Sequence, residues 1–346
     1  MLLSTENAFA DRCVPVDPVI VARIITAYNL AKEAQKGKPD EYQVGNEWTP
    51  IYERYMGDIM AKLARHDNPA VATVYGNFFR DACSVGLHGM PVDMLSTYFS
   101  GPVSAELGSL YLNDLTHRFK IWLTTLGKEM ALTELQTPVI GNPYGCTIDG
   151  VFYRSGVDYL HYYATTIRRL LGDPDAHHTV LELGGGFGGM AYFLMRDSRH
   201  LTYIDVDLPE NMALTAFYLL SAFPEKKFLL YGEADLATIR LNTYDAVLLP
   251  NFEIERLTGD SIDLSFNSYS LAEMTRPTIH KYLEHINRCT IQYFFHVNHT
   301  SNCKVGADEF PVDLQKFALL FRAPALWNHA RNKDMDEFEF VYKARP

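Results

Sequence analysis

The sequence predicts an α/β protein in which a doubly wound, mostly parallel sheet follows a largely helical N-terminal region. In the stretch 179–211, an apolar run, a glycine cluster, a helical apolar stretch and a second apolar run follow one another. Apolar residues also recur at helical spacing through most of the first 126 positions. Two strand-like runs, FALLFRAPALWN and MDEFEFVYKA, lie near the end of the chain. We therefore expect a helical domain or lid at residues 1–135 and the α/β domain at residues 136–346.

The composition narrows the class of function. A chain of 346 residues with 47% apolar residues can bury a full-sized core. A formal net charge of −11 argues against a nucleic-acid substrate, because contact with phosphates needs clustered Lys and Arg. The five scattered cysteines contain no C-x-x-C pair, so neither a disulfide framework nor a cysteine zinc site is indicated. No apolar stretch has the length of a signal peptide or membrane span, and we expect a cytoplasmic protein.

The N-terminal region is expected to consist of helices separated by Gly and Pro breaks. The predicted helices are Pro18 to about Gln35, Trp48 to Leu63, Pro69 to Val85 and Leu95 to Leu126. Residues 137–158 are dense in Gly, Pro and Asn, which predicts a loop or irregular hairpin. A further helix, from about Tyr159 to Leu171, leads into the first strand of the sheet.

The glycine cluster after that strand predicts a ligand-binding turn. Gly184, Gly185, Gly186 and Gly188 lack a Cβ, so a ligand at the carboxyl end of the strand can approach the backbone closely. So many glycines would destabilise a plain strand-to-helix connection. Asp205 closes the second strand, where a carboxylate can accept hydrogen bonds from both hydroxyls of a ribose.

Glu182, two residues before the first glycine, indicates which of two candidate cofactors the turn binds. The glycine pattern alone fits both a dinucleotide such as NAD and S-adenosylmethionine (SAM). A carboxylate at this position would repel a pyrophosphate, whereas it would attract the ammonium and sulfonium groups of SAM. We therefore predict SAM as the cofactor, with S-adenosylhomocysteine as its product.

Two assignments of the third and fourth strands are possible. The preferred one places them at 244–249 and 262–266; Pro250, Asn251 and Phe252 then hold the adenine, and Asn267 and Ser268 face the methyl-transfer site. The other places them at 228–231 and 244–249, and gives the adenine role to Gly232, Glu233 and Asp235.

Several residues before the first strand are candidates for holding the cofactor's carboxylate. Arg154 could do so through a charge-assisted fork, and Tyr159, Tyr162 or Tyr163 by hydroxyl donation. For each tyrosine, packing against the sheet explains its presence equally well.

The motifs LELGGGFGG, YIDVDLPEN, VLLP, FNSYSLAEM and FHVNHTSN together resemble the sugar O-methyltransferase family of bacterial polysaccharide and glycan loci, over roughly residues 140–340. The first motif is common to all class I SAM-dependent methyltransferases. The S-x-x-E-M segment at Ser270 to Met274 and the N-H pair after the fifth strand are more particular. The resemblance implies a class I methyltransferase Rossmann-like sheet closed by an antiparallel C-terminal hairpin.

For function, the same resemblance implies SAM-dependent methylation of a sugar hydroxyl in polysaccharide or glycoconjugate biosynthesis. The partner would be a sugar, nucleotide-sugar or glycan acceptor, and the oligomeric state stays open, a homo-oligomer included. An NAD(P)-dependent oxidoreductase and a non-catalytic SAM-binding subunit of a glycan assembly complex are the alternatives.

A sugar hydroxyl is a weak nucleophile, and a general base typically contributes about 10²- to 10⁴-fold to its reaction. His299 and His296 are equal first candidates because histidine titrates near neutrality. Strand alternation places His296 and Asn298 on one face of the strand and His299 on the other face. It does not indicate which of these faces meets the cleft. Glu273 is the third candidate, as base or orienting group. No metal-ligand set is indicated.

Overall fold

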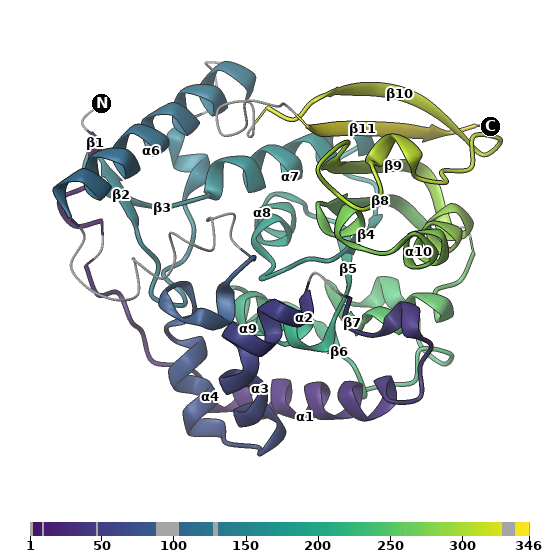
Figure 1. Ribbon diagram of the computed structural model, residues 1–346, viewed down its shortest axis with the longest axis horizontal. Helices are drawn as coiled ribbons and strands as arrows, with labels where there is room; N and C mark the ends of the chain where they lie inside the picture. Colours follow the sequence, from purple (N-terminus) through teal and green to yellow (C-terminus); the bar gives the residue numbers. More distant parts are fainter. Residues whose placement is uncertain are drawn as a thin grey trace.

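The computed structural model describes residues 3–345 except residues 9, 46, 47, 88–103, 127–130, 260 and 327–335. Its centre is an eight-stranded mixed sheet of order β10-β11-β9-β8-β4-β5-β7-β6 (Figure 1). From β9 to β6 all neighbours are parallel, while β11 runs antiparallel to both β9 and β10. The strands are β4 (His178–Leu183), β5 (Leu201–Asp207), β6 (Phe228–Leu230), β7 (Ala246–Pro250), β8 (Ile262–Ser268), β9 (Thr290–His299), β10 (Phe317–Pro324) and β11 (Glu337–Ala344).

All three runs named in the two strand assignments are strands of this sheet. In chain order Phe228–Leu230 is the third strand and Ala246–Pro250 the fourth, as in the alternative assignment. In space, β7 lies beside β5 and β8 lies beside β4, while Phe228–Leu230 pairs with the outer side of β7 at the edge of the sheet.

Helices cover both faces of the sheet. In Figure 1, α7, α8 and α9 lie to the left of the parallel strands and α10 lies to the right. Pro209 is the first residue of α9, a position that suits proline because a backbone N–H there would have no partner within the helix. These helices are α7 (Val157–Leu171), α8 (Gly189–Asp197), α9 (Pro209–Ala222) and α10 (Arg276–Cys289).

The N-terminal helices form a further layer on one side of the molecule. Asp17 caps α1 by accepting a hydrogen bond from the Val19 amide, and α1 packs along α9. The predicted helix from Trp48 is interrupted by the π-helical turn η2 (Tyr52–Met56), and the one from Pro69 ends early and continues as short 3₁₀ turns. Residues 95–103 of the fourth predicted helix lie outside the described residues. The helices are α1 (Pro18–Gln35), α2 (Trp48–Ile51), α3 (Gly57–Ala64), α4 (Asn68–Tyr75) and α6 (Ala105–Leu126).

A small three-stranded sheet lies beside α6. β2 (Gly145–Ile148) and β3 (Val151–Arg154) form a hairpin, which was one of the two structures expected for residues 137–158. β1 (Leu3–Ser4) pairs with β2. The turn between β2 and β3 contains Asp149 and Gly150, both at positive φ, as a tight two-residue connection requires.

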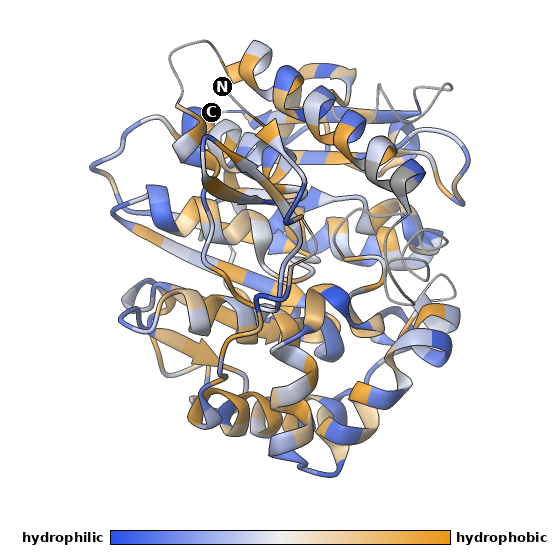
Figure 2. Ribbon diagram, turned by 90° about the vertical axis from the view of Figure 1, so that its left-hand side faces the viewer, coloured by the Kyte–Doolittle hydropathy of each residue, from blue (hydrophilic) through white to orange (hydrophobic). Residues whose placement is uncertain are grey.

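Two apolar clusters lie on opposite faces of the central sheet. One joins the N-terminal helices to α7, α8 and α9, and the other lies under α10. Consistent with burial on both faces, the inner strands are apolar along most of their length, while the helices in Figure 2 mix orange and blue residues. No helix among the described residues is both long and apolar enough to cross a bilayer.

The segment after β8 reaches α10 through a short irregular stretch, because α10 begins only at Arg276. Before it, Ser270–Glu273 form a 3₁₀ turn, η8, and Met274 and Thr275 are extended. The sharp turn begins at Tyr269, whose φ of 67° is uncommon for a residue with a side chain.

Candidate functional site

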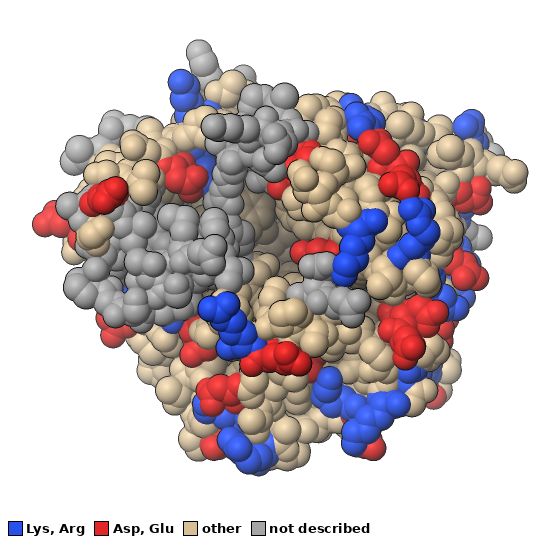
Figure 3. Space-filling view, viewed as in Figure 1, with Lys and Arg blue, Asp and Glu red and all other residues tan. Residues whose placement is uncertain are grey.

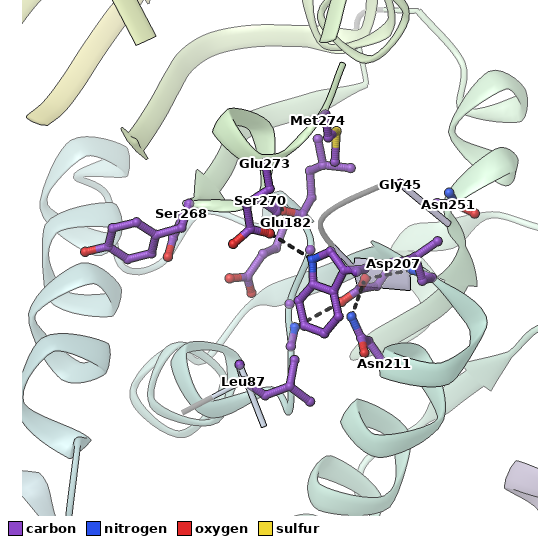
Figure 4. A pocket seen from close by; sticks show the side chains of 18 of the residues that line it. Gly45, Leu87, Glu182, Asp207, Asn211, Asn251, Ser268, Ser270, Glu273 and Met274 are labelled. Atoms are coloured by element: carbon purple, nitrogen blue, oxygen red, sulfur yellow. Dashed lines mark hydrogen bonds between the residues drawn. The ribbon is translucent and has the colours of Figure 1, made fainter. Parts of the chain in front are cut away.

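A cavity of about 870 Å³ lies along the edge of the sheet where the parallel strands end. Its mouth is the hollow near the centre of Figure 3. Residues at or just after the ends of β7, β5, β4, β8 and β9 line it, together with the first residue of antiparallel β11. These six strands span five inter-strand spacings, or roughly 24 Å. Figure 4 shows Asn251, Asp207 and Asn211 toward one end and Ser268 and Glu273 toward the other.

The glycine turn forms the floor of the cavity. Gly184, Gly185 and Gly186 line it, whereas Gly188 starts α8 and packs against α9. Gly184 has a φ of +80°, and a Cβ there would lie 2.6 Å from the Ser270 hydroxyl. Only glycine therefore fits this position, because both the backbone angle and the space exclude a side chain.

Glu182 lies at the cavity floor with a nearly buried side chain. The Tyr203 hydroxyl donates a 2.6 Å hydrogen bond to its carboxylate. Burial raises the pKa of Glu182 to about 8, and the Asp207 charge adds to the rise, while the Tyr203 hydrogen bond opposes it. The site thus contains a carboxyl group that a cationic ligand would help to ionise.

The structure corrects the assignment of Asp205. Its carboxylate is fully buried, accepts a 3.0 Å hydrogen bond from the Gly185 amide, and does not line the cavity. Asp207, at the last position of β5, lines the cavity instead. Asp205 pairs with Glu182 in the β4–β5 ladder, and Asp207 follows two positions later on the same side of the strand, at its end.

Asp207 is held in place by donors from three directions. The amides of Gly186 and Leu208 and the side chain of Asn211 donate to it at 3.1, 2.7 and 3.2 Å. Burial raises the pKa of Asp207 to about 7, although these hydrogen bonds act in the opposite direction.

At this end of the cavity, one of the three residues expected near the adenine lines the wall. Asn251 does so, and its amide donates to the Tyr282 hydroxyl at 2.8 Å. Pro250 ends β7 without lining the cavity, and Phe252 is buried in the apolar cluster under α10. These two assignments are corrected.

At the other end, Ser268 lines the cavity but Asn267 does not. The Asn267 amide donates to the Leu183 carbonyl at 2.8 Å and accepts from Asn298 at 2.9 Å, so it joins β4, β8 and β9 from within. Asn267 is therefore a structural residue of the sheet edge.

The two histidines of β9 have different surroundings. His299 lines the cavity, and its Nδ1 lies 3.2 Å from Oδ2 of the buried Asp336. His296 is fully buried, stacks on Phe340 at 4.6 Å, and has its pKa lowered to about 3 by burial. The assignment of His296 as a base is corrected, because a fully buried ring in an apolar stack lies outside the cavity lining.

Glu273 lines the cavity and is bonded to the N-terminal region. The Trp48 indole donates to its carboxylate at 2.8 Å, which is the dashed contact to Glu273 in Figure 4. Both residues line the cavity. The helical region therefore contributes a wall, whose members are Asp40, Glu41, Gln43, Val44, Gly45, Trp48, Gly86, Leu87 and Arg118.

Arg118 lines the cavity, whereas Arg154 does not. The Arg154 guanidinium lies over the rings of Phe79 and Phe187 at 4.8 and 5.0 Å, away from the cavity. Among the described lining residues, Arg118 is the one Lys or Arg, and it pairs with Asp114 at 2.9 Å.

Tyr162 is also displaced from its expected role. It donates to Glu339 at 2.9 Å outside the cavity, while Tyr159 and Tyr163 line it. The residues after the alternative strand, Gly232, Glu233 and Asp235, do not line this cavity either.

Besides Asp207, Arg118 and Trp48, the site contains three further residues that were not anticipated: Tyr269, Asp336 and Glu337. His299, Asp336 and Glu337 each bring one ligand-type atom within 4.8 Å of the others. Tyr269 lies beside Tyr163 and Glu337; burial raises its pKa well above the usual value, and the Glu337 charge adds to the rise. The acid pair in MDEFEFVYKA was a visible signal, but its position opposite His299 depends on the β9–β11 register.

Neither family models nor curated protein sequences match this chain. Among solved structures, the N-methyltransferase NodS from Bradyrhizobium japonicum WM9 is 12% identical, with a TM-score of 0.35 over 54% of this chain and 87% of that one. Geranyl diphosphate C-methyltransferase from Streptomyces coelicolor A3(2) is 12% identical, with a TM-score of 0.35 over 55% and 78%. The PH0226 protein from Pyrococcus horikoshii OT3 is 9% identical, with a TM-score of 0.37 over 54% and 92%. Likeness at this level carries no argument about activity, which depends on the site itself.

Proposed function

We propose that this protein is a SAM-dependent O-methyltransferase whose acceptor is a sugar, nucleotide-sugar or glycan hydroxyl. The observation that carries the proposal is one continuous cavity with an acidic, glycine-floored end and a His299–Asp336 pair at the other end. When bound, SAM would supply a methyl group on a sulfonium, and its transfer to oxygen leaves S-adenosylhomocysteine.

The acidic end suits the donor in three respects. Asp207 ends the second strand, where a carboxylate can accept from ribose hydroxyls. Glu182 offers a nearly buried carboxylate for the ammonium group. The bare glycine floor permits close approach of the ligand to the backbone. A pyrophosphate in the same place would face both carboxylates, which disfavours a dinucleotide.

Arg118 is the candidate partner for the donor's carboxylate. It lies in the cavity wall near Tyr159 and Leu160, at the start of the helix that precedes the first strand. Its link to Asp114 holds the guanidinium in place. On this proposal the N-terminal region is part of the donor site rather than a separate appendage.

At the acceptor end, His299 serves as the base and Asp336 as its positioning residue. A proton on Nδ1 donated to Asp336 leaves Nε2 as the acceptor. The hydroxyl proton passes to Nε2 as the oxygen forms its new bond to carbon. Asp336 then stabilises the resulting imidazolium because its carboxylate is almost fully buried beside it.

Titration calorimetry with S-adenosylhomocysteine and with NADH tests the proposal. We expect binding of the first at micromolar concentrations and none of the second. Saturation by NADH without a response to S-adenosylhomocysteine would establish the oxidoreductase alternative. Transfer of a deuterated methyl group from SAM to glycan acceptors, read by mass spectrometry, separates an enzyme from a non-catalytic subunit.

A further inference from the structure

The cavity is strongly acidic for one that would accept a sugar derivative. Its described lining includes the carboxylates of Asp40, Glu41, Glu182, Asp207, Glu273 and Glu337. Arg118 opposes them as a single basic side chain among those residues, and it is already paired with Asp114 and, at 3.5 Å, with Asp158. An anionic group entering this cavity would therefore meet net negative charge.

The carboxylates divide between the two ends. Glu182 and Asp207 lie at the donor end, and Asp40 and Glu41 belong to the N-terminal wall. Glu273 is engaged by the Trp48 indole. Glu337 lies at the acceptor end, directly opposite His299 in the β9–β11 pairing.

Glu337 is close to the proposed base. Its Oε1 lies 3.9 Å from His299 Nδ1, and its side chain is about one-tenth exposed. Tyr269 lies beside it in the same wall of the cavity. A ligand held by Glu337 would thus have a neighbouring hydroxyl within reach of His299.

Aromatic side chains line the same end of the cavity. Tyr163 lines it, and Tyr269 packs 5.8 Å from the His299 ring. Aromatic faces beside a carboxylate favour a cation, because the ring quadrupole and the negative charge act in the same direction.

We infer that the methyl acceptor carries a protonated amino group next to the hydroxyl that is methylated, and that it carries no phosphate. Glu337 binds the ammonium, and the tyrosines enclose it. The inference rests on the proposed function and narrows it to free amino sugars or glycans that end in one, and it argues against nucleotide sugars.

The test uses wild-type protein saturated with S-adenosylhomocysteine and matched monosaccharides. In each of the gluco, galacto and manno series, binding is measured for the methyl 2-amino-2-deoxyglycoside, its N-acetyl form, the plain methyl glycoside and the 6-phosphate. We expect the amine to bind about 10- to 100-fold more tightly than the plain glycoside in at least one series, as for a charge-assisted hydrogen bond. Its N-acetyl form should lose this gain, and the phosphate should bind most weakly.

Glu337→Gln should reduce the preference for the amine to within about threefold while leaving the affinity for S-adenosylhomocysteine unchanged. Glu33→Gln, at an exposed site on α1, is the matched control. Equal or tighter binding of the phosphate, an undiminished preference in Glu337→Gln, or no amine binding at 10 mM in any series would overturn the inference. Failure of S-adenosylhomocysteine to bind would instead overturn the proposed function, so the two failures are distinguishable.

Discussion

The two ends of the cavity are built in different ways. At the donor end, Glu182, the glycine turn and Asp207 come from one contiguous strand-turn-helix-strand unit. At the acceptor end, the wall is formed by residues far apart in the sequence, such as Trp48 and Glu273, which are 225 positions apart. A local unit thus supplies most of the proposed donor end, to which the N-terminal region adds Arg118, whereas the proposed acceptor end depends on the whole fold. Substitutions at the two ends should therefore separate binding of the donor from catalysis.

The largest expected effect is at the acceptor end. His299→Gln should lower turnover about 10²- to 10⁴-fold because the general base is lost. The affinity for S-adenosylhomocysteine should change by less than about threefold, as measured by calorimetry. His280→Gln, at an exposed position of α10, is the control. Turnover within twofold of wild type in His299→Gln would show that His299 is not the general base.

The next effect distinguishes the two aspartates of β5. Asp207→Asn should weaken binding of S-adenosylhomocysteine about 10- to 100-fold, the magnitude of a charged hydrogen bond. Asp205→Asn should leave this affinity within about threefold, because the buried Asp205 supports the Gly185 amide from behind. Thermal unfolding of both variants checks that each is folded. The reverse order of affinities would restore Asp205 as the ribose ligand.

The affinity for SAM measured over a pH series tests the role of Glu182 at the donor end. With the pKa of Glu182 at about 8, most of the ligand-free protein at pH 7 carries this carboxyl protonated. A cationic ligand prefers the ionised form, so SAM affinity should rise roughly tenfold between pH 7 and 9 and then level off. Burial also raises the pKa values of its titratable neighbours Tyr203, Asp205 and Asp207.

The measurement is calorimetry in buffers of different ionisation enthalpy, which should report proton release on binding. Glu182→Gln should bind more weakly and with a flatter pH profile. A profile that is flat in the wild-type protein would show that Glu182 does not contact the cation.

The smallest expected effect is at the hydrogen bond between the N-terminal region and the segment after β8. Trp48→Phe removes the hydrogen bond to Glu273 but keeps an aromatic ring in the wall. Loss of about 0.5–1.5 kcal/mol corresponds to a rise of about two- to tenfold in the KM for the acceptor. The KM for SAM should not change. An effect on SAM alone would place Trp48 at the donor end instead.

The same contrast explains what the sequence could predict. The strands of the sheet and the glycine turn follow from local patterns of apolar residues and glycines. Asp205 and Asp207 share one face of a strand, so alternation could not indicate which of them passes the edge. Arg118 and Asp336 reach the site through tertiary packing and a strand register, neither of which leaves a periodic signal in the chain.

The reversed direction of β11 has one more consequence. A parallel strand in that position would begin at the far edge, and Glu337 would lie about eight residues, or roughly 27 Å, from His299. By entering from the opposite side, the last segment of the chain brings its opening residues to the rim where the others finish. Any truncation or C-terminal fusion that unpairs this strand should therefore impair chemistry before it impairs attachment of the methyl donor.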